Sequence, residues 1–253
     1  MKIGVVIPAH TEAVCVALSI ANCRAALLAL AAMADVRIMV CDNASSDGTG
    51  RIARDAGAEV VREARRGYGF ACLAAMRELG EWPDVVLYCD ADATTPIADI
   101  ARLAAAMQDE RVDLCIGARR NVSAGSMSAP QRFGNALATG LIRLLWGRAY
   151  FDLGPTRAIR LNALQRMAMR DTTWGWTVEM QIKAVALGMN AIEIPVAWQA
   201  RPAGKSKISG TISGVARAGF KILWTVATLF VSTRIGSADT LPSSPHTPPA
   251  EHV

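Results

Sequence analysis

The sequence predicts an α/β protein whose central, mostly parallel sheet carries helices on both faces. Over the first 120 residues, short β-branched runs alternate with Ala- and Leu-rich stretches of helical spacing, which is the pattern of successive βαβ units. Most of these runs are almost continuously apolar, as expected for parallel strands covered on both faces. The predicted strands are Ile3–Pro8, Val36–Cys41, Glu59–Val61, Val85–Cys89 and Asp113–Ile116.

Helical spacing fills the intervals between these strands and much of the second half of the chain. In the first half the predicted helices are 12–33, 47–56, 69–80 and 97–108. The less regular second half contains predicted helices at 131–147, 161–169, 177–187 and 211–233, an extended segment at 156–160 and a strand at 191–198. Residues 235–253 are rich in Pro, Ser and Thr, so we expect a disordered tail.

The composition excludes a disordered chain or a coiled coil for the bulk of the protein. Hydrophobic residues make up 52% of the 253 residues and charged residues 19%, whereas proteins average about 45–50% and about 25%. The net charge is +5. A positive balance of this kind suits nucleic acid, phosphate ligands or anionic lipid, so the position of the charges decides between these partners.

The positive charge is concentrated near the C-terminus. No acidic residue occurs between Glu193 and Asp239. Apolar side chains at helical spacing lie among the basic ones there, which favours a helix resting on anionic lipid over a nucleic-acid groove; a plain core helix is the alternative. The stretch Ala136–Tyr150 is a candidate for a second membrane-facing element. The basic residues of the acid-free segment are Arg201, Lys205, Lys207, Arg217, Lys221 and Arg234.

No segment is typical of a signal peptide or a membrane span. The sequence enters its first predicted strand at Ile3, and the longest apolar run, Ile222–Val231, is shorter than the roughly 20 residues of a spanning helix. The six cysteines show no C-x-x-C or Cys/His spacing, which favours buried free thiols in a reducing compartment.

Carboxylates follow three of the predicted strands. Glu12 follows the first, Asp42 the second, and Asp90 and Asp92 the fourth. Ligands of such sheets bind beyond the carboxyl ends of the strands, so these side chains are candidates for one site. Two carboxylates one residue apart at the end of a buried strand repel each other unless a positive group lies between them. Because Mg²⁺ typically binds one or two carboxylates together with phosphate oxygens, Asp90 and Asp92 predict a metal–diphosphate site.

Seven segments, in order, resemble the family 2 glycosyltransferases, which have the GT-A fold. The resemblance covers about residues 3 to 230 and is strongest to the branch of dolichol-phosphate mannosyltransferases and bacterial polyprenyl-phosphate glycosyltransferases. The segments are VVIPAHTEA, CDNASSDGT, RRGYGFA, CDADATTP, DLGPTRAIR, WTVEMQ and RPAGKSKISG.

The resemblance implies a nucleotide-binding site at the first three segments. Pro8, Glu12 and Asp42 match the residues that line the nucleobase pocket in the family, and Gly67 matches a turn beside the donor. The family's usual Tyr-Asn between the Pro and the Glu is His10-Thr11 here. This difference falls on the contacts to the base and the ribose.

The D-x-D segment of the family is Asp90-Ala91-Asp92 in this sequence. The resemblance implies that Asp90 and Asp92 hold Mg²⁺ or Mn²⁺ on the donor diphosphate and that Asp90 and Ala91 border the nucleotide. The mannosyltransferases often carry a Gln two residues after the second Asp, and this sequence has Thr94 there.

The resemblance also implies a set of phosphate-binding residues. In the mannosyltransferases, an Arg after strand five, an Arg in the next helix and an Arg in a later loop contact phosphates of the donor or the lipid acceptor. Guanidinium groups suit this role because they bind phosphate in a bidentate manner. The matching residues here are Arg119, Arg132 and Arg201, with Ser206 and Lys207 in the same loop as Arg201.

These assignments predict a metal-dependent, inverting sugar transfer from a UDP- or GDP-sugar to a polyprenyl phosphate, with Asp92 and Arg201 acting on the leaving diphosphate. An ionised phosphate needs little or no general base. A hydroxyl acceptor, such as a diglyceride, a hopanoid or a saccharide, instead requires a carboxylate base. Glu179 or Asp152 would supply it. A non-catalytic, peripheral membrane protein that binds nucleotides is a third alternative, which the presence of both Asp90 and Asp92 disfavours.

We therefore expect one domain over residues 1–234. Residues 1–120 would form the nucleotide-sugar-binding half, 121–210 the acceptor half and 211–234 an amphipathic, membrane-facing helix. The expected partners are a nucleotide sugar, a polyprenyl phosphate and the membrane surface, not nucleic acid. The expected location is cytoplasmic, at the inner face of the plasma membrane.

Overall fold

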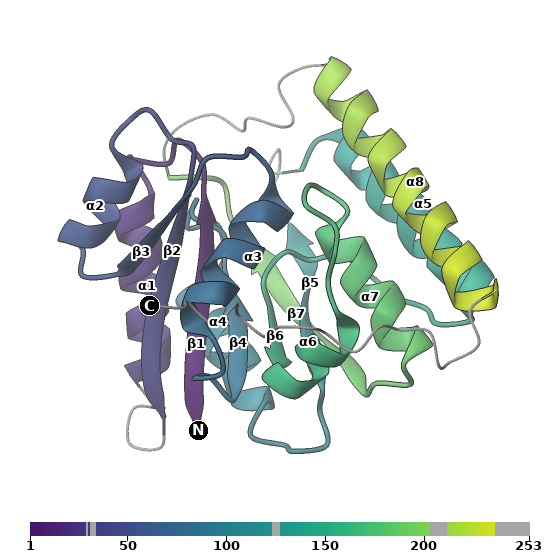
Figure 1. Ribbon diagram of the computed structural model, residues 1–253, viewed down its shortest axis with the longest axis horizontal. Coiled ribbons are helices and arrows are strands. Elements are labelled where there is room, and N and C mark those ends of the chain that lie inside the picture. Colours follow the sequence, from purple (N-terminus) through teal and green to yellow (C-terminus); the bar gives the residue numbers. More distant parts are fainter. Residues whose placement is uncertain (29, 31–33, 123–126, 203–211, 236–253) are drawn as a thin grey trace, which may run out of the picture.

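A seven-stranded sheet forms the centre of the molecule (Figure 1). The computed structural model describes residues 1–28, 30, 34–122, 127–202 and 212–235. Within these residues the strand order is β3-β2-β1-β4-β6-β5-β7, and every neighbouring pair is parallel except those that β6 makes with β4 and β5. This confirms the predicted mostly parallel sheet. The strands are β1 (Lys2–Ala9), β2 (Asp35–Asn43), β3 (Glu59–Glu63), β4 (Val85–Tyr88), β5 (Leu114–Val122), β6 (Arg157–Arg160) and β7 (Ala191–Trp198).

Helices cover both faces of this sheet (Figure 1). The core on one face includes side chains of α1 (Val16–Leu28), α2 (Thr49–Asp55) and α4 (Ile97–Ala106). The core on the other face includes side chains of α3 (Tyr68–Leu79), α6 (Leu161–Met167) and α7 (Trp176–Ala186). Two longer helices, α5 (Ala129–Trp146) and α8 (Ile212–Ile235), pack against α7 and against each other.

The apolar strands bury side chains in both cores. On β1, Ile3, Val5 and Ile7 enter the core with α1 and α4, and Val6 enters the opposite core. This alternation follows from the two-residue repeat of a strand. It explains why the central strands are almost continuously apolar.

Strand β5 is longer than the sequence predicted. It runs to Val122 instead of Ile116, because its parallel pairing with β7 continues up to Trp198, with one irregularity between Arg119 and Asn121. The added residues, GARRNV, lack the apolar pattern that marks a buried strand. Arg119 therefore lies within β5 and not after it.

Two predictions concern the C-terminal part of the chain. The predicted helix at 211–233 is confirmed as α8. No helix within the described residues has both the length and the hydropathy needed to cross a bilayer. The predicted disordered tail lies outside the described residues, apart from Ile235.

Candidate active site

The loops that follow β1, β2 and β4 leave the sheet at the same edge and turn sharply. Each contains a non-glycine residue in the left-handed region, namely Thr11 (φ 56°), Ala44 (φ 54°) and Ala93 (φ 57°). Among the described residues, Ala168 is the only other non-glycine residue with a positive φ. Such conformations are sparsely populated and persist where surrounding contacts hold them, often at functional sites.

Arg201, in the segment after β7, joins two of these loops. Its Nη1 lies 3.1 and 3.2 Å from the two carboxylate oxygens of Glu12, and its Nη2 lies 3.1 Å from Oδ2 of Asp92. The exposed fractions of the side chains are 22% for Arg201, 11% for Glu12 and 10% for Asp92. The structure thus brings together three predicted site residues from three distant parts of the chain. The guanidinium neutralises carboxylates that would otherwise repel each other.

Asp90 lies within electrostatic range of this cluster. Burial raises the pKa of Asp90 to about 7, the negative charge of Asp92 acts in the same direction, and Arg119 and Arg201 oppose the shift. Asp92 is further fixed by Thr94, whose backbone N–H and hydroxyl donate to Oδ1 at 3.2 and 2.7 Å. The two Asp residues thus form a pair of hard oxygen donors whose mutual repulsion a bound cation would relieve.

The pair fits a divalent cation whose remaining ligands come from elsewhere. The described part of the chain contains no group of three or more His, Cys, Asp or Glu side chains suited to hold a metal. Mg²⁺ and related ions often take only one or two carboxylates together with substrate phosphates. Ala91, between the two Asp residues, is buried in the core with α1 and α4, so a donor would contact its backbone at most.

Asn43, at the end of β2, makes hydrogen bonds to two other loops on the predicted nucleobase side, the loop after β1 and the turn before α3. Its Oδ1 accepts the N–H of Gly67 at 2.8 Å, and its backbone oxygen lies 2.6 Å from Nδ1 of His10. Asp42, the preceding residue, accepts the N–H of Ser45 at 3.1 Å in an Asx-type turn. Asp42 and Pro8 are both half-buried. Asn43 was not among the residues predicted from the sequence, although a buried polar residue at the end of an apolar strand is a usable signal.

Gly67 and Gly69 allow two loops to approach closely. A Cβ atom at Gly67 would lie 2.2 Å from the carbonyl oxygen of Thr172, and one at Gly69 would lie 2.0 Å from that of Asp171. The backbone N–H groups of Gly69 and Phe70 donate to the carbonyls of Thr173 and Thr172, at 3.2 and 2.9 Å. The first N–H groups of α3 are therefore already paired, and the glycines serve loop packing at this edge.

We expect Gly69→Ala to lower the free energy of unfolding by about 3 kcal/mol, because the new methyl group would displace the carbonyl of Asp171. The expected fall in Tm is roughly 6–12 °C. Gly140→Ala is the matched control: apart from the neighbouring backbone of α5 itself, no atom lies within 4 Å of a Cβ built on Gly140, and Ala should stabilise that helix by about 0.5–1 kcal/mol. Denaturant unfolding of both variants checks this; an unchanged stability of Gly69→Ala would contradict the close approach.

Arg119 and Asp152 form a buried ion pair. Nε and Nη2 of Arg119 lie 2.6 and 2.8 Å from the two oxygens of Asp152, and the backbone N–H of Arg119 donates to Oδ2 at 2.9 Å. The side chains are 13% and 3% exposed. The Arg119 guanidinium also lies 5.1 Å from the ring centre of Trp198. Both members of the pair thus have partners within the protein.

Three predicted phosphate-binding residues remain, and the structure describes one of them, Arg132. Arg132 is exposed in the first turn of α5, where Nη1 donates to the carbonyl of Met127 at 3.1 Å. It makes no contact with the Glu12–Arg201–Asp92 cluster that the structure describes. Ser206 and Lys207 lie outside the described residues.

Glu179, the predicted base, lies in α7 and is 3% exposed. Its carboxylate accepts the backbone N–H of Arg170 at 3.0 Å and that of Asp171 at 2.7 Å, and it pairs with Nζ of Lys183 at 2.7 Å. Burial lowers the pKa of Lys183, and the charge of Glu179 opposes this shift. Glu179 thus holds the loop before α7 in place.

The mostly parallel sheet with helices on both faces is that of the GT-A fold. The family model described as glycosyl transferase family 2 matches residues 4–167, and the chain belongs to this family. A solved structure of glucosyl-3-phosphoglycerate synthase from Mycobacterium tuberculosis, in complex with Mn²⁺, UDP and phosphoglyceric acid, superposes with a TM-score of 0.72. The match covers 90% of this chain and 78% of that one at 18% identity, which shows the shared fold.

Sequence relatives resemble the chain over most of its length. It is 33% identical to an uncharacterized glycosyltransferase of M. tuberculosis, over 72% of this chain and 82% of the relative. It is 29% identical to the undecaprenyl-phosphate mannosyltransferase of Micrococcus luteus, over 85% and 91%. A third relative, the dolichyl-phosphate hexose transferase of Haloferax volcanii, is 31% identical over 70% and 76%.

Proposed function

We propose that the protein transfers a sugar from a UDP- or GDP-sugar to a polyprenyl phosphate, with inversion at the anomeric carbon, at the cytoplasmic face of the membrane. One observation carries the choice of acceptor: the two carboxylates predicted as bases for a hydroxyl acceptor, Glu179 and Asp152, are both buried and paired within the protein. The names of the relatives, an undecaprenyl-phosphate mannosyltransferase and a dolichyl-phosphate hexose transferase, support the same acceptor class.

A hydroxyl acceptor would need a base within hydrogen-bond reach of its proton. Glu179 is 3% exposed and occupied by Lys183 and two backbone N–H groups. Asp152 is 2% exposed and occupied by Arg119. A phosphate acceptor is already ionised and requires neither. The site therefore favours a phosphate over a diglyceride, hopanoid or saccharide hydroxyl.

In the proposed reaction, a phosphate oxygen of the acceptor attacks the anomeric carbon while the bond to the donor diphosphate breaks. The electron pair of that bond moves to the leaving diphosphate, and a single displacement inverts the anomeric carbon. Arg201 would bind the leaving phosphates, and Glu12 and Asp42 would line the nucleobase pocket. Asp90 and Asp92 would hold Mg²⁺ or Mn²⁺, which when bound neutralises charge on the diphosphate. The protein supplies positioning and electrostatic stabilisation.

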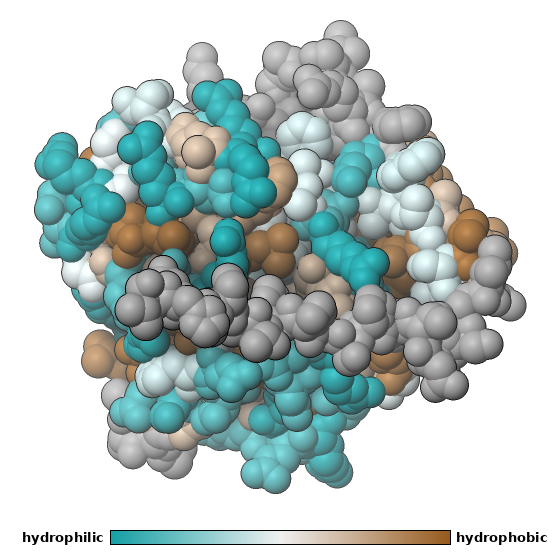
Figure 2. Space-filling view, viewed as in Figure 1, coloured by the Kyte–Doolittle hydropathy of each residue, from teal (hydrophilic) through white to brown (hydrophobic). Residues whose placement is uncertain are grey.

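The outer face of the α5–α8 pair is suited to a membrane surface. Its exposed apolar side chains include Phe133 and Leu144 on α5 and Leu223, Trp224 and Val231 on α8. Figure 2 shows hydrophobic surface on the right-hand side of the view, where these two helices lie. Neither helix contains an acidic residue. Apolar side chains without negative charge favour contact with anionic lipid.

We expect Leu144→Glu combined with Val231→Glu to weaken binding to vesicles of anionic lipid at least tenfold, because both side chains are exposed, by 77% and 52%, on this face. Leu28→Glu is the matched control: Leu28 is 70% exposed on α1, away from the α5–α8 pair. Vesicle flotation measures the bound fraction. Equal flotation of the double variant and the wild type would reject this face as the membrane contact.

The donor half of the proposal is tested by thermal unfolding with a panel of UDP- and GDP-sugars, with and without Mn²⁺. A ligand that binds the folded state and not the unfolded state raises Tm, and the rise grows with the ratio of its concentration to Kd. We expect one nucleotide to raise Tm, and to do so only with the metal. The acceptor half is tested by comparing sugar transfer to a polyprenyl phosphate with sugar transfer to the corresponding polyprenol. We expect the polyprenyl phosphate to accept the sugar and the polyprenol not to.

A further inference from the structure

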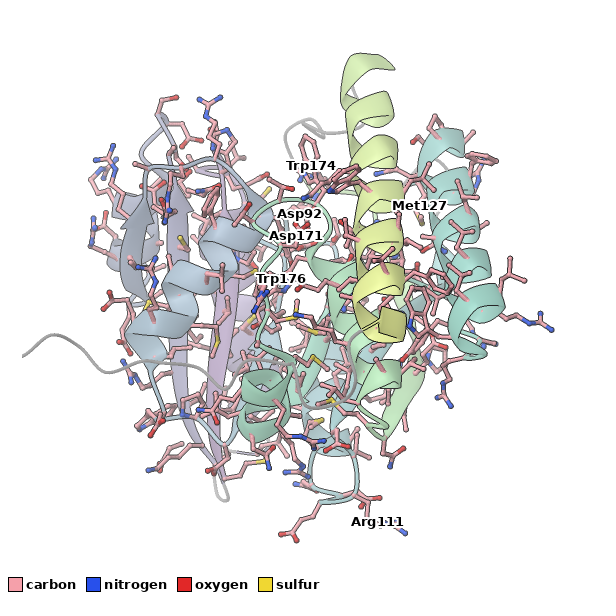
Figure 3. The ribbon with its side chains drawn as sticks, turned by 45° about the vertical axis from the view of Figure 1, so that its right-hand side comes forward. Asp92, Arg111, Met127, Asp171, Trp174 and Trp176 are labelled. Atoms are coloured by element: carbon pink, nitrogen blue, oxygen red, sulfur yellow. The ribbon has the colours of Figure 1, made fainter. Side chains whose placement is uncertain are left out.

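The loop between α6 and α7 connects helix α8 with the N-terminus of α3. Figure 3 shows Asp171 and Trp174 of this loop beside α8, in the same part of the view as Asp92 and at the opposite end from Arg111. Asp171 begins the segment 171–175, which contacts both helices. The contacts on each side use different groups: the Asp171 side chain faces α8, and the backbone carbonyls of the loop face α3.

On the α8 side, Oδ2 of Asp171 lies 3.0 Å from Nζ of Lys221 and accepts the hydroxyl of Thr225 at 3.3 Å. On the loop side, Oδ1 accepts the backbone N–H of Thr173 at 2.7 Å and that of Gly175 at 3.1 Å. The Asp171 side chain is 5% exposed. One buried carboxylate therefore sets the shape of the loop and attaches it to α8.

The loop and α8 are closely packed around Asp171. A Cβ atom on Gly175 would lie 2.3 Å from Oδ2 of Asp171 and 2.4 Å from Oγ1 of Thr225. Close packing of this kind transmits a shift of α8 to the loop, because interiors at this density do not deform freely.

On the α3 side, the loop carbonyls of Thr172 and Thr173 accept the N–H groups of Phe70 and Gly69. The turn that opens α3 contacts the candidate donor pocket through Gly67, which donates its backbone N–H to Oδ1 of Asn43, at the end of β2.

We propose that Asp171 is a positioning residue that couples helix α8 to the Gly67–Tyr68 turn and so sets the place of this turn beside Asn43, at the end of β2. The proposal rests on the proposed function only where it treats the turn as a wall of the donor pocket. It adds a physical connection between α8 and the candidate donor site. We therefore expect a substitution of Lys221, on α8, to weaken the backbone hydrogen bonds at the start of α3.

Hydrogen exchange at the backbone amides of Gly69 and Phe70 tests this coupling directly, without donor or acceptor. In Lys221→Met and Asp171→Asn we expect these amides to exchange at least tenfold faster than in the wild type. Thr225→Val should shift them in the same direction. Thr228→Val is the matched control, because Thr228 lies one turn further along α8 and donates to carbonyls of α8 itself.

Two exchange results would overturn the proposal. One is exchange of Gly69 and Phe70 within twofold of the wild type in both Lys221→Met and Asp171→Asn. The other is acceleration that is equal at the amides of β1, which would mean that the variants only lower global stability. Neither result depends on whether the protein uses a polyprenyl phosphate, so a failure here is separate from a failure of the proposed function.

Nucleotide binding provides the second readout, with UDP plus Mn²⁺ and GDP plus Mn²⁺ as probes. We expect the nucleotide that binds the wild type to bind Lys221→Met at least fivefold more weakly, and Lys221→Arg to restore binding because it keeps the pair with Asp171. Faster exchange with unchanged affinity would contradict the part of the proposal that concerns the donor pocket. If neither nucleotide binds the wild type, the proposed donor is wrong, and the exchange data alone decide the coupling.

Discussion

Asp92→Asn is expected to lower kcat for sugar transfer about 10³-fold without loss of the fold. Asn has the same shape and its carbonyl can still accept from Thr94, which now donates to Oδ1 of Asp92. What is lost is the negative charge that faces Arg201 and that would hold the metal on the donor diphosphate. Removal of one group that stabilises charge in the transition state typically costs about 10²–10³ in rate, and loss of a metal ligand adds to this.

The measurement is kcat at saturating donor, acceptor and Mn²⁺, together with Tm. Asp109→Asn is the matched control, since Asp109 forms an exposed pair with Arg111 at the opposite end of the molecule (Figure 3). We expect Asp109→Asn to keep the wild-type kcat. If Asp92→Asn retained more than about a tenth of the activity, the assignment of Asp92 as a metal ligand would have to be abandoned.

Arg119→Met is expected to lower the free energy of unfolding by about 3–5 kcal/mol, since it leaves the buried carboxylate of Asp152 without its cation. The corresponding fall in Tm is on the order of 10 °C. Arg119→Met combined with Asp152→Leu should recover part of this loss, because apolar replacement of a buried pair is often neutral. Denaturant titration of the single and double variants measures both effects.

Arg111→Met is the control for Arg119→Met. The Arg111 side chain is 85% exposed and pairs with Asp109 at the surface, so its removal should cost at most about 1 kcal/mol. A stable Arg119→Met protein with a raised KM for the acceptor would contradict the structural role of the ion pair. It would instead support Arg119 as the phosphate ligand that the family resemblance implies.

The strands were predicted well from the sequence where burial on both faces requires a continuously apolar run. β1, β2 and β4 are apolar because both of their faces are covered, and their ends were placed within about two residues. The second half of β5 carries Arg119 and Arg120, so nothing in its pattern distinguishes it from a loop. The extended segment at 156–160 was predicted, but its antiparallel direction in β6 comes from the path of the chain and is invisible in a local pattern.

The candidate site was predictable where one local segment determines the geometry. Asp90 and Asp92 follow a buried strand, and their position at the sheet edge needs no further information. The contact of Arg201 with Glu12 joins residues 189 positions apart, and no local spacing encodes it. The role of Gly69 was hidden for the same reason: its partner is the carbonyl of Asp171, in a loop that packs on α3 only in the folded chain.

The polar contacts of the predicted bases could not be predicted from the sequence either. Glu179 and Asp152 are acidic residues in segments that resemble an acceptor site, so the sequence presents them as candidate bases. In the structure both are buried and paired: Glu179 with Lys183 and with the loop before α7, and Asp152 with Arg119. Such occupancy depends on tertiary contacts, which one sequence does not reveal.

Transfer of labelled sugar to undecaprenyl phosphate tests the central claim most directly. The purified protein is incubated with Mn²⁺, with labelled UDP- and GDP-sugars in turn, and with either undecaprenyl phosphate or undecaprenol; label is then counted in the chloroform phase. We predict chloroform-soluble label with at least one donor, with undecaprenyl phosphate and not with undecaprenol, and its loss in Asp92→Asn. Absence of such label with every donor, or equal labelling of undecaprenol, would contradict a polyprenyl phosphate as the acceptor.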